Sequence, residues 1–315
     1  MANTKEIKSR INSVKGTQKI TNAMYMISST KMRKARTELD KTRPYFESLR
    51  KEIVNIYRLS GGIDSRLVNP EIDDAISGTD VAVLVITADK GLAGAYNQNV
   101  IRRTEILLKR HERDRVRLFV VGEYGRQYFS RHKIPVEQSF LYTAQSPSLG
   151  RAREISEHLI KLYMDGIVDR VVIIYTDFSA NNDSEAKSYT ALPLNRSFIE
   201  SSRQRVEYLD DEETNYEFYP SATAVLENVV TSYVTGIIYS TLVDSFCSEH
   251  NARMTAMDAA NRNAEELIGA LSVKYNRLRQ AQITQEITEI SAGAKAQRLK
   301  RMKRAQKRLE EAKTP

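Results

Sequence analysis

Residues Ala252–Ile290 read ARMTAMDAANRNAEELIGALSVKYNRLRQAQITQEITEI. No proline occurs between Pro220 and Pro315, so a helix could run through this stretch unbroken. Apolar residues recur at spacings of three and four, the period of a helix face. They are Leu226, Val230, Val234, Ile237, Leu242, Phe246, Leu267, Leu271, Leu278, Ile283, Ile287 and Ile290. A helix over 221–297 would be roughly 115 Å long, far more than one compact domain needs.

The N-terminal arm can supply the partner that such a long helix requires. Residues 3–59 are predicted to be helical, with Pro44 bending or being accommodated in the helix. Apolar residues again follow a helical spacing, at Ile7, Ile11, Val14, Ile20, Met24, Ile27, Phe46, Leu49, Ile53 and Ile56. Spacings of three and four match a seam between two packed helices. We therefore predict that the two terminal helices pair.

The middle of the chain changes from helical periodicity to short apolar runs. Three runs are continuous enough to be strands covered on both faces, at 81–86, 116–122 and 170–175. Helical segments are predicted at 97–111, 123–131 and 150–164. This alternation indicates a largely parallel sheet. Residues 189–198 could add an edge strand, with Pro193 marking its peripheral position.

The predicted fold class is therefore α/β: a long antiparallel coiled coil of N- and C-terminal helices plus a central Rossmann-like α/β domain. The predicted divisions are an N-terminal coiled-coil helix at 1–60, a globular domain at 61–215, a C-terminal coiled-coil helix at 216–297 and a basic extension at 298–315.

Composition excludes several classes of site. The single cysteine, Cys247, rules out a disulfide within the chain and is expected to be buried in a helix. The four histidines show no metal-ligand spacing, and no carboxylate stands isolated in an apolar run as a perturbed acid. No stretch approaches a membrane span, and the N-terminus lacks a secretory core. We expect no catalytic site, no metal and no cofactor.

Two features leave alternatives open. Residues 87–96 follow a strand and precede a helix, where phosphate-binding loops occur, but they lack the glycine spacing of such loops. Gly91 and Gly94 could instead let the turn approach a neighbouring element. The net charge of +8 favours an acidic partner, a nucleic acid or an anionic membrane face. A basic cluster at 31–36 and a basic tail at 298–313 could each be a solvated face or a contact surface.

Three long motifs resemble one family, the gamma subunits of rotary F-type ATP synthases. They are EIKSRINSVKGTQKITNAMYMISSTKMRKA at 6–35, ITADKGLAGAYN at 86–97, and the pair SEHNARMTAMDAANRNAEELI and YNRLRQAQITQEITEISAGA in the C-terminal helix. The resemblance runs in order from the start to about Ala296. It implies a central shaft without an active site, whose antiparallel coiled coil turns inside a catalytic head and couples ion-driven ring rotation to ATP synthesis.

The resemblance also implies partners and contact residues. The partners are the alpha and beta head subunits, an epsilon subunit and a c-subunit ring, with no nucleic acid and only indirect membrane association, at the cytoplasmic face of a bacterial cell membrane. The implied head-coupling residues are Met24, Lys31, Arg33, Lys34, Arg36, Glu249, Arg253, Arg279, Gln280 and Thr284. Tyr216, Glu217 and Phe218 would lie where the foot meets the ring.

The chain departs from the family pattern at its C-terminus. Members commonly end soon after the segment that corresponds to Gly293-Ala294, whereas this chain continues to Pro315. The regulatory cysteine pair of chloroplast relatives is missing, and no transit peptide precedes the arm, which favours a bacterial origin. The alternatives to a shaft are a coiled-coil scaffold or nucleic-acid-binding protein, and a nucleotide-dependent enzyme built on the middle domain. The sequence sets neither the coupling ion nor the preferred direction.

Overall fold

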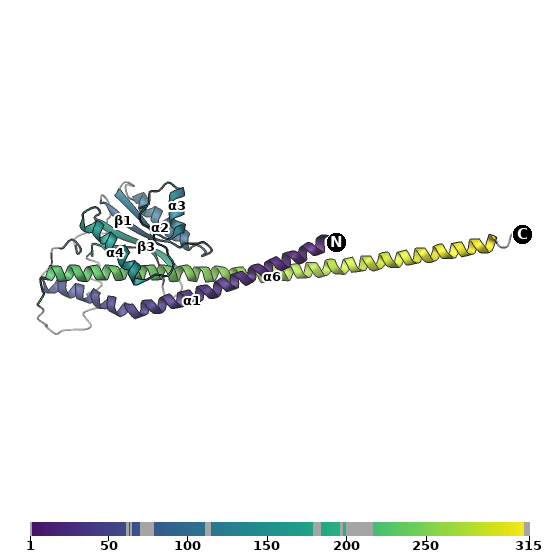
Figure 1. Cartoon of the computed structure of the whole chain (residues 1–315), viewed down its shortest axis with the longest axis horizontal. Helices are drawn as coiled ribbons and strands as arrows, with labels where there is room; N and C mark the ends of the chain where they lie inside the picture. Colours follow the sequence, from purple (N-terminus) through teal and green to yellow (C-terminus); the bar gives the residue numbers. More distant parts are fainter. Residues whose placement is uncertain are drawn as a thin grey trace. The chain divides into compact units, whose positions relative to one another are not determined.

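The structure, a computed structural model, describes residues 2–60, 63, 65–69, 79–110, 115–178, 184–195, 198–199 and 217–311 (Figure 1). Side chains are described for these residues except 2, 3, 184 and 305–311. The chain forms two compact units. One is Met24–Ala256, and the other combines Met1–Ala23 with Met257–Pro315. The predicted domain boundaries after 60 and after 215 adjoin residues outside the described ranges.

Two long helices dominate the secondary structure, as the periodicity predicted. Helix α1 spans Ala2–Leu59 and continues through Pro44. Helix α6 spans Ala222–Glu311, so it passes the predicted end at residue 297 without a break and includes most of the basic extension. Among the described residues, no helix is both long and apolar enough to cross a membrane.

The middle of the chain folds into one four-stranded sheet. Its strands are β1 Val81–Ile86, β2 Val116–Val121, β3 Arg170–Phe178 and β4 Ser184–Leu192, in the spatial order β2-β1-β3-β4. β1 pairs in parallel with both β2 and β3, and β4 pairs antiparallel with β3. The intervening helices are α2 Tyr96–Arg110, α3 Glu123–Arg131 and α4 Leu149–Met164. The α/β expectation is therefore confirmed.

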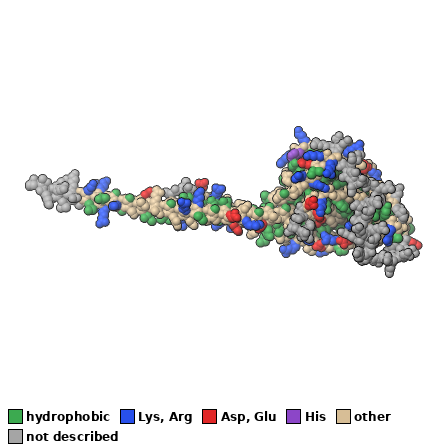
Figure 2. All heavy atoms as spheres, turned by 180° about the vertical axis from the view of Figure 1, so that it is seen from behind, with side chains coloured by type: hydrophobic (Ala, Val, Ile, Leu, Met, Phe, Trp, Pro, Cys, Tyr) green, Lys and Arg blue, Asp and Glu red, His purple; other side chains and the backbone are tan. Residues whose placement is uncertain are grey.

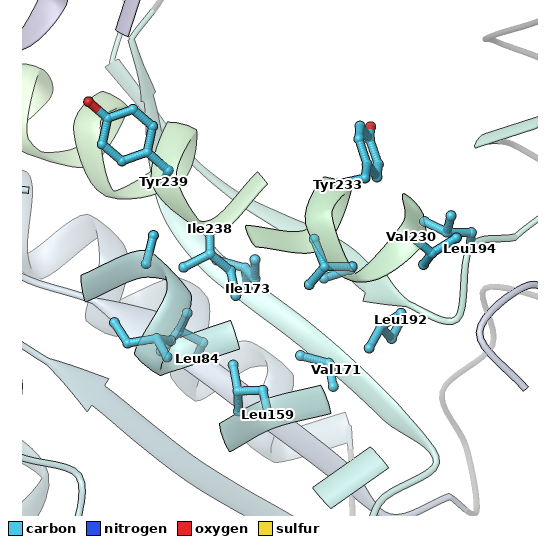
Figure 3. Packing of buried hydrophobic residues seen from close by; sticks show 14 of the residues in the cluster. Leu84, Leu159, Val171, Ile173, Leu192, Leu194, Val230, Tyr233, Ile238 and Tyr239 are labelled. Atoms are coloured by element: carbon cyan, nitrogen blue, oxygen red, sulfur yellow. The ribbon is translucent and has the colours of Figure 1, made fainter. Parts of the chain in front are cut away.

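Alternate residues of the central strands enter two separate cores, which explains why the strands are continuously apolar. Val83 and Val85 of β1 pack with buried residues of α2 and α3 on one face. Leu84 packs on the other face with α4 and with α1 and α6. Figure 3 shows Ile173 of β3 beside Ile238 of α6 within this second core. The two long helices are thus part of the domain's own packing.

The edge strand exists, but its predicted bounds, 189–198, were wrong: β4 is Ser184–Leu192. β4 ends at Leu192 and does not extend to Phe198. Pro193 has no N–H to continue the ladder with β3. Beyond it the chain pairs elsewhere, because Leu194 N donates to Leu67 O at 2.9 Å and Asn69 N donates to Leu194 O at 3.0 Å.

The smaller unit is a pair of antiparallel helix segments. Thr4 Oγ1 donates to Gln282 Oε1 at 3.3 Å, and Gln18 Nε2 donates to Glu265 Oε1 at 3.1 Å, so rising numbers on α1 meet falling numbers on α6. Thr21 and Asn261 bond across the same seam. The shielded positions recur with the heptad spacing of a coiled coil. The shielded residues that follow this spacing are Thr4, Ile7, Ile11, Val14, Gln18 and Thr21 on α1, and Met257, Asn261, Ala264, Ile268, Leu271, Tyr275, Leu278 and Gln282 on α6.

Several apolar residues that we assigned to the helix seam lie outside it. On α1, Ile20 is 63% exposed and Ile27 is 55% exposed. On α6 the exposed ones are Leu267, Ile283, Ile287 and Ile290. Near Ile20 and Leu267, polar residues such as Gln18 occupy the seam and bond across it. Ile283, Ile287 and Ile290 follow Gln282, which already bonds to Thr4 near the start of α1. The apolar residues are left on the outer surface.

Candidate functional site

The turn that follows β1, residues Thr87–Ala95, is anchored on three sides. Thr87 N donates to Val121 O at 2.9 Å, which ties the turn to the end of β2. The carboxylate of Asp89 accepts from Glu123 N and from Ala144 N, each at 3.1 Å. Asp89 thereby satisfies an N–H in the first turn of α3, whose own N-cap, Gly122, has no side chain to do so.

The fourth neighbour of this turn is α6. Arg253 Nη2 donates to Gly91 O at 3.2 Å. Ala252 packs against Ala88 and Ala93 in a small cluster of its own. Gly94 has φ +53°, and a Cβ there would come within 3.9 Å of Ala252 O. The contacts with Arg253 and Ala252 place this turn against α6. They do not explain the glycines by crowding, because a Cβ on Gly91 would meet nothing within 4 Å and 3.9 Å at Gly94 is an ordinary contact; the positive φ of Gly94 is what favours glycine there.

Arg253 belongs to a buried ionic cluster. Its Nη2 lies 2.7 Å from Glu249 Oε1, with the two side chains 9% and 10% exposed. Its Nη1 lies 3.3 Å from His250 Nδ1. Burial raises the pKa of Glu249 against the opposing effect of Arg253. Burial, helped by Arg253, lowers the pKa of His250 to about 4, so this imidazole is neutral at pH 7.

Four of the predicted contact residues come together beside this cluster. Met24, Lys31, Glu249 and Arg253 line one pocket of about 320 Å³ between α1, α6 and the turn 89–92. The structure places Glu249 and Arg253 inside the unit, where they hold the turn. Met24 is half-buried and Lys31 is exposed.

The remaining predicted residues lie in separate places. Arg33, Lys34 and Arg36 are exposed on α1, and the Arg36 guanidinium carbon lies 5.5 Å from the centroid of the Phe178 ring. Arg279, Gln280 and Thr284 are exposed on α6 in the smaller unit. Glu217 is exposed and Phe218 packs against the larger core, whereas Tyr216 lies outside the described residues.

The sequence analysis did not identify one carboxylate whose pKa is shifted. Asp244 of α6 has its pKa raised to about 7, first by burial and then by Asp177, with Arg43 and Arg36 acting in the opposite direction. The expectation that no carboxylate stands in an apolar run was wrong, because Asp244 directly follows Val243 and precedes Phe246. That local signal was available. The proximity of Asp177 was not, because it depends on the packing of β3 against α6.

We expect Asp244 to make folding stability fall as pH rises from about 4 to about 7. Across this range the folded chain keeps a proton that the unfolded chain, with the ordinary pKa of 3.8, has released. The slope from this group is about 1.4 kcal/mol per pH unit. Asp244→Asn should remove this pH dependence. The free energy of unfolding of the variant, measured relative to that of the parent, should therefore increase as pH rises. Urea unfolding at several pH values measures this, with Asp258→Asn on the exposed helix surface as control. Parallel pH profiles for Asp244→Asn and the parent would contradict it.

Cys247 is expected to be inert in the folded protein. Its side chain is 2% exposed, its Sγ lies 3.8 Å from Met32 O, and burial raises its pKa to about 12. Because the thiolate is the reactive form, iodoacetamide at pH 8 should leave the folded chain unmodified and alkylate it fully in urea. Mass spectrometry of the intact protein reads the result, and rapid alkylation without urea would contradict it.

No group of three or more His, Cys, Asp or Glu side chains gathers as a metal site in the part of the chain that the structure describes.

Comparison with known proteins defines the class of protein to which this chain belongs. Residues 3–297 match the ATP synthase family. The ATP synthase gamma chain of Ruminiclostridium cellulolyticum is 41% identical over 298 residues, covering 93% of this chain and 98% of that one. The ATP synthase gamma chain of Halothermothrix orenii is 39% identical over 296 residues, covering 94% and 99%.

Solved structures agree on the fold. A chain of the Euglena gracilis mitochondrial ATP synthase (OSCP/F1/c-ring) aligns with a TM-score of 0.62 at 18% identity, covering 94% of each chain. A chain of the Tetrahymena thermophila mitochondrial ATP synthase central stalk and c-ring aligns with a TM-score of 0.52 at 22% identity, covering 76% of this chain and 99% of that one.

The chain therefore belongs to the ATP synthase gamma chain family. This confirms the resemblance drawn from the three motifs. The chain is the non-catalytic rotor shaft of an F-type ATP synthase and takes part in ATP synthesis. The scaffold, nucleic-acid and enzyme alternatives are set aside.

Proposed function

We propose that the chain turns inside a head of alpha and beta subunits, stands with an epsilon subunit on a c-subunit ring, and works at the cytoplasmic face of a bacterial cell membrane. Relatives named as bacterial gamma chains over nearly their full length support this proposal. The Euglena and Tetrahymena proteins come from assemblies that contain a c-ring. The membrane association of the chain would be indirect, through the ring.

The head-facing surface would consist of exposed residues from both units. In the larger unit these are Lys31, Arg33, Lys34 and Arg36, with Met24 at the edge of the pocket. Exposed cations can make and exchange contacts with acidic loops at low cost, because surface ion pairs contribute only about 0–1 kcal/mol each. A bearing that must turn needs contacts of this weak, replaceable kind.

Glu249 and Arg253 would act differently from the other predicted contacts. Their side chains are buried and committed to each other and to Gly91 O. We assign them the task of fixing the α/β domain to α6, so that a force on the domain is passed to the helix. The ring-facing role of Glu217 and Phe218 rests only on the family resemblance.

The single observation that carries the proposal is the match of residues 3–297, which spans both long helices up to Gln297. Arg279, Gln280 and Thr284 offer its sharpest test, because their side chains are exposed and are not needed to fold the smaller unit.

We expect the triple variant Arg279→Ala, Gln280→Ala, Thr284→Ala to assemble with alpha and beta subunits but to lower ATP hydrolysis by about tenfold, equivalent to a rise of about 1.4 kcal/mol in the activation free energy. Purification by size followed by an ATP hydrolysis assay measures both properties. Arg277→Ala is a matched control, since Arg277 is a neighbouring exposed residue outside the predicted set. Full hydrolysis by the triple variant would remove these residues from the head-facing surface.

A further inference from the structure

The strongest feature that the shaft function does not use is the end of α6 beyond residue 297. The family match ends at residue 297, yet α6 continues to Glu311 without interruption. At 1.5 Å per residue, residues 298–311 extend the helix by about 20 Å along its own axis.

The extension holds most of the excess charge of the protein. Residues 298–315 contain eight Lys or Arg and two Glu, so they carry six of the eight formal net positive charges. The other 297 residues are almost balanced. Five of the cations, Arg298, Lys300, Arg301, Lys303 and Arg304, fall within seven described residues, and Figure 2 shows blue side chains beside the grey end of the helix.

These five cations are available for a partner. All residues from 291 to 304 are exposed, and none of the five makes a salt bridge to another described residue. Nothing within the described chain therefore neutralises them. A run of like charges on a helix repels itself, so an acidic surface alongside would lower its free energy.

The chemistry of the segment distinguishes between classes of acidic partner. No aromatic residue follows Tyr275, so the tail lacks the side chains on which nucleic-acid bases stack. Within residues 298–304 the large exposed apolar residues are Leu299 and Met302. Two such side chains make too small an apolar face for this segment to lie in a membrane surface. Cations flanking a small apolar ridge suit the rim of a protein–protein contact.

We propose that residues 298–304 bind an acidic protein surface on a neighbouring subunit of the ATP synthase. This inference rests on the proposed assembly with the head. The contact is electrostatic and forms within about 10 Å of the end of the family segment, measured along the helix axis. It weakens as salt shortens the Debye length from about 10 Å at 0.1 M to about 3 Å at 1 M.

Carbodiimide cross-linking of the assembled complex tests this directly, because it joins a lysine amine to a carboxylate only where the two are in contact. Lys300 or Lys303 should become linked to an Asp or Glu of another subunit at low salt, and the link should be lost at 1 M salt. Peptide mass spectrometry identifies both ends. Links confined to this chain, or none from either lysine, would overturn the inference.

Two variants separate the effect of the positive charge from the reactivity of the lysine amines. Lys300→Arg with Lys303→Arg keeps the charge and removes the amines, so the cross-link should vanish while salt-sensitive ATP hydrolysis persists. Changing Lys300, Arg301, Lys303 and Arg304 to Gln keeps a good helix former and removes the charge, so ATP hydrolysis by this variant should be less sensitive to salt than hydrolysis by the parent. Equal salt profiles for parent and Gln variant would overturn the proposal.

Controls with the full chain address the other partners. Binding to vesicles containing anionic phospholipid, or to a DNA duplex, that depends on the four cations and occurs without the cross-link would overturn the protein partner. Failure of the parent chain to assemble with alpha and beta subunits would overturn the proposed assembly itself. Assembly without the cross-link overturns only the inference about the tail.

Discussion

Replacing Gly122 by alanine is expected to unfold the α/β domain. Gly122 has φ +95°, a conformation that L side chains rarely adopt, and a Cβ there would lie 2.2 Å from Thr87 O and 2.8 Å from Ala88 O. Both contacts are with backbone oxygens of the turn after β1. These oxygens cannot easily move away, because Thr87 N is bonded to Val121 O. We expect a loss of at least about 4 kcal/mol, a large share of the stability of an ordinary domain.

Gly150→Ala provides the matched comparison. Gly150 lies in the first turn of α4, and a Cβ there would meet nothing within 4 Å. Alanine should be neutral or stabilise by up to about 1 kcal/mol. Urea unfolding of the full chain, followed by circular dichroism, measures both variants. Similar midpoints for Gly122→Ala and the parent would mean that the junction of turn and strand can relax, against our description.

Arg253→Ala is expected to be strongly destabilising. It leaves the carboxylate of Glu249, 7% exposed as a residue, without its ion-pair partner, and it removes the donor to Gly91 O. Breaking a buried pair from one side costs about 3–5 kcal/mol. The backbone amides of the turn near Gly91 should also exchange hydrogen faster, because the turn loses its bond to α6.

Arg262→Ala is the control for this prediction. Arg262 pairs with Asp258 through the same four-residue spacing on α6, but its side chain is 70% exposed. Such surface pairs contribute about 0.3–0.5 kcal/mol. Unfolding free energies and hydrogen exchange by mass spectrometry compare the two variants. Equal losses would show that burial of the Glu249–Arg253 pair does not matter, which would contradict its assignment as the joint.

The sequence predicted well wherever a local pattern determines the structure. The run Val81–Ile86 became β1 with those bounds, because a strand covered on both faces must be apolar throughout. Helix α3 also has its predicted bounds, Glu123–Arg131. Both long helices were predicted from their spacing and lack of breakers.

The features that the sequence analysis did not predict depend on contacts between residues far apart in the sequence. Thr21 and Asn261 bond across the smaller unit, 240 residues apart in sequence, so polar residues occupy a seam that apolar spacing alone assigned to Ile20 and its neighbours. The bond from Arg253 to Gly91 spans 162 residues, and no pattern within the helix signals it. Glu249 and Arg253, which the family resemblance implied as head contacts, are buried and paired with each other in the structure.

Rotation of single molecules tests the central claim most directly. A Ser130→Cys substitution puts a reactive thiol on the exposed end of α3, while buried Cys247 stays unlabelled. A bead attached there, on a head of alpha and beta subunits fixed to glass, reports the motion of the α/β domain. We predict that ATP drives stepwise rotation in one direction, and that rotation stops when ATP is exhausted. Sustained ATP hydrolysis with a bead that does not turn would contradict the assignment of this chain as the rotor.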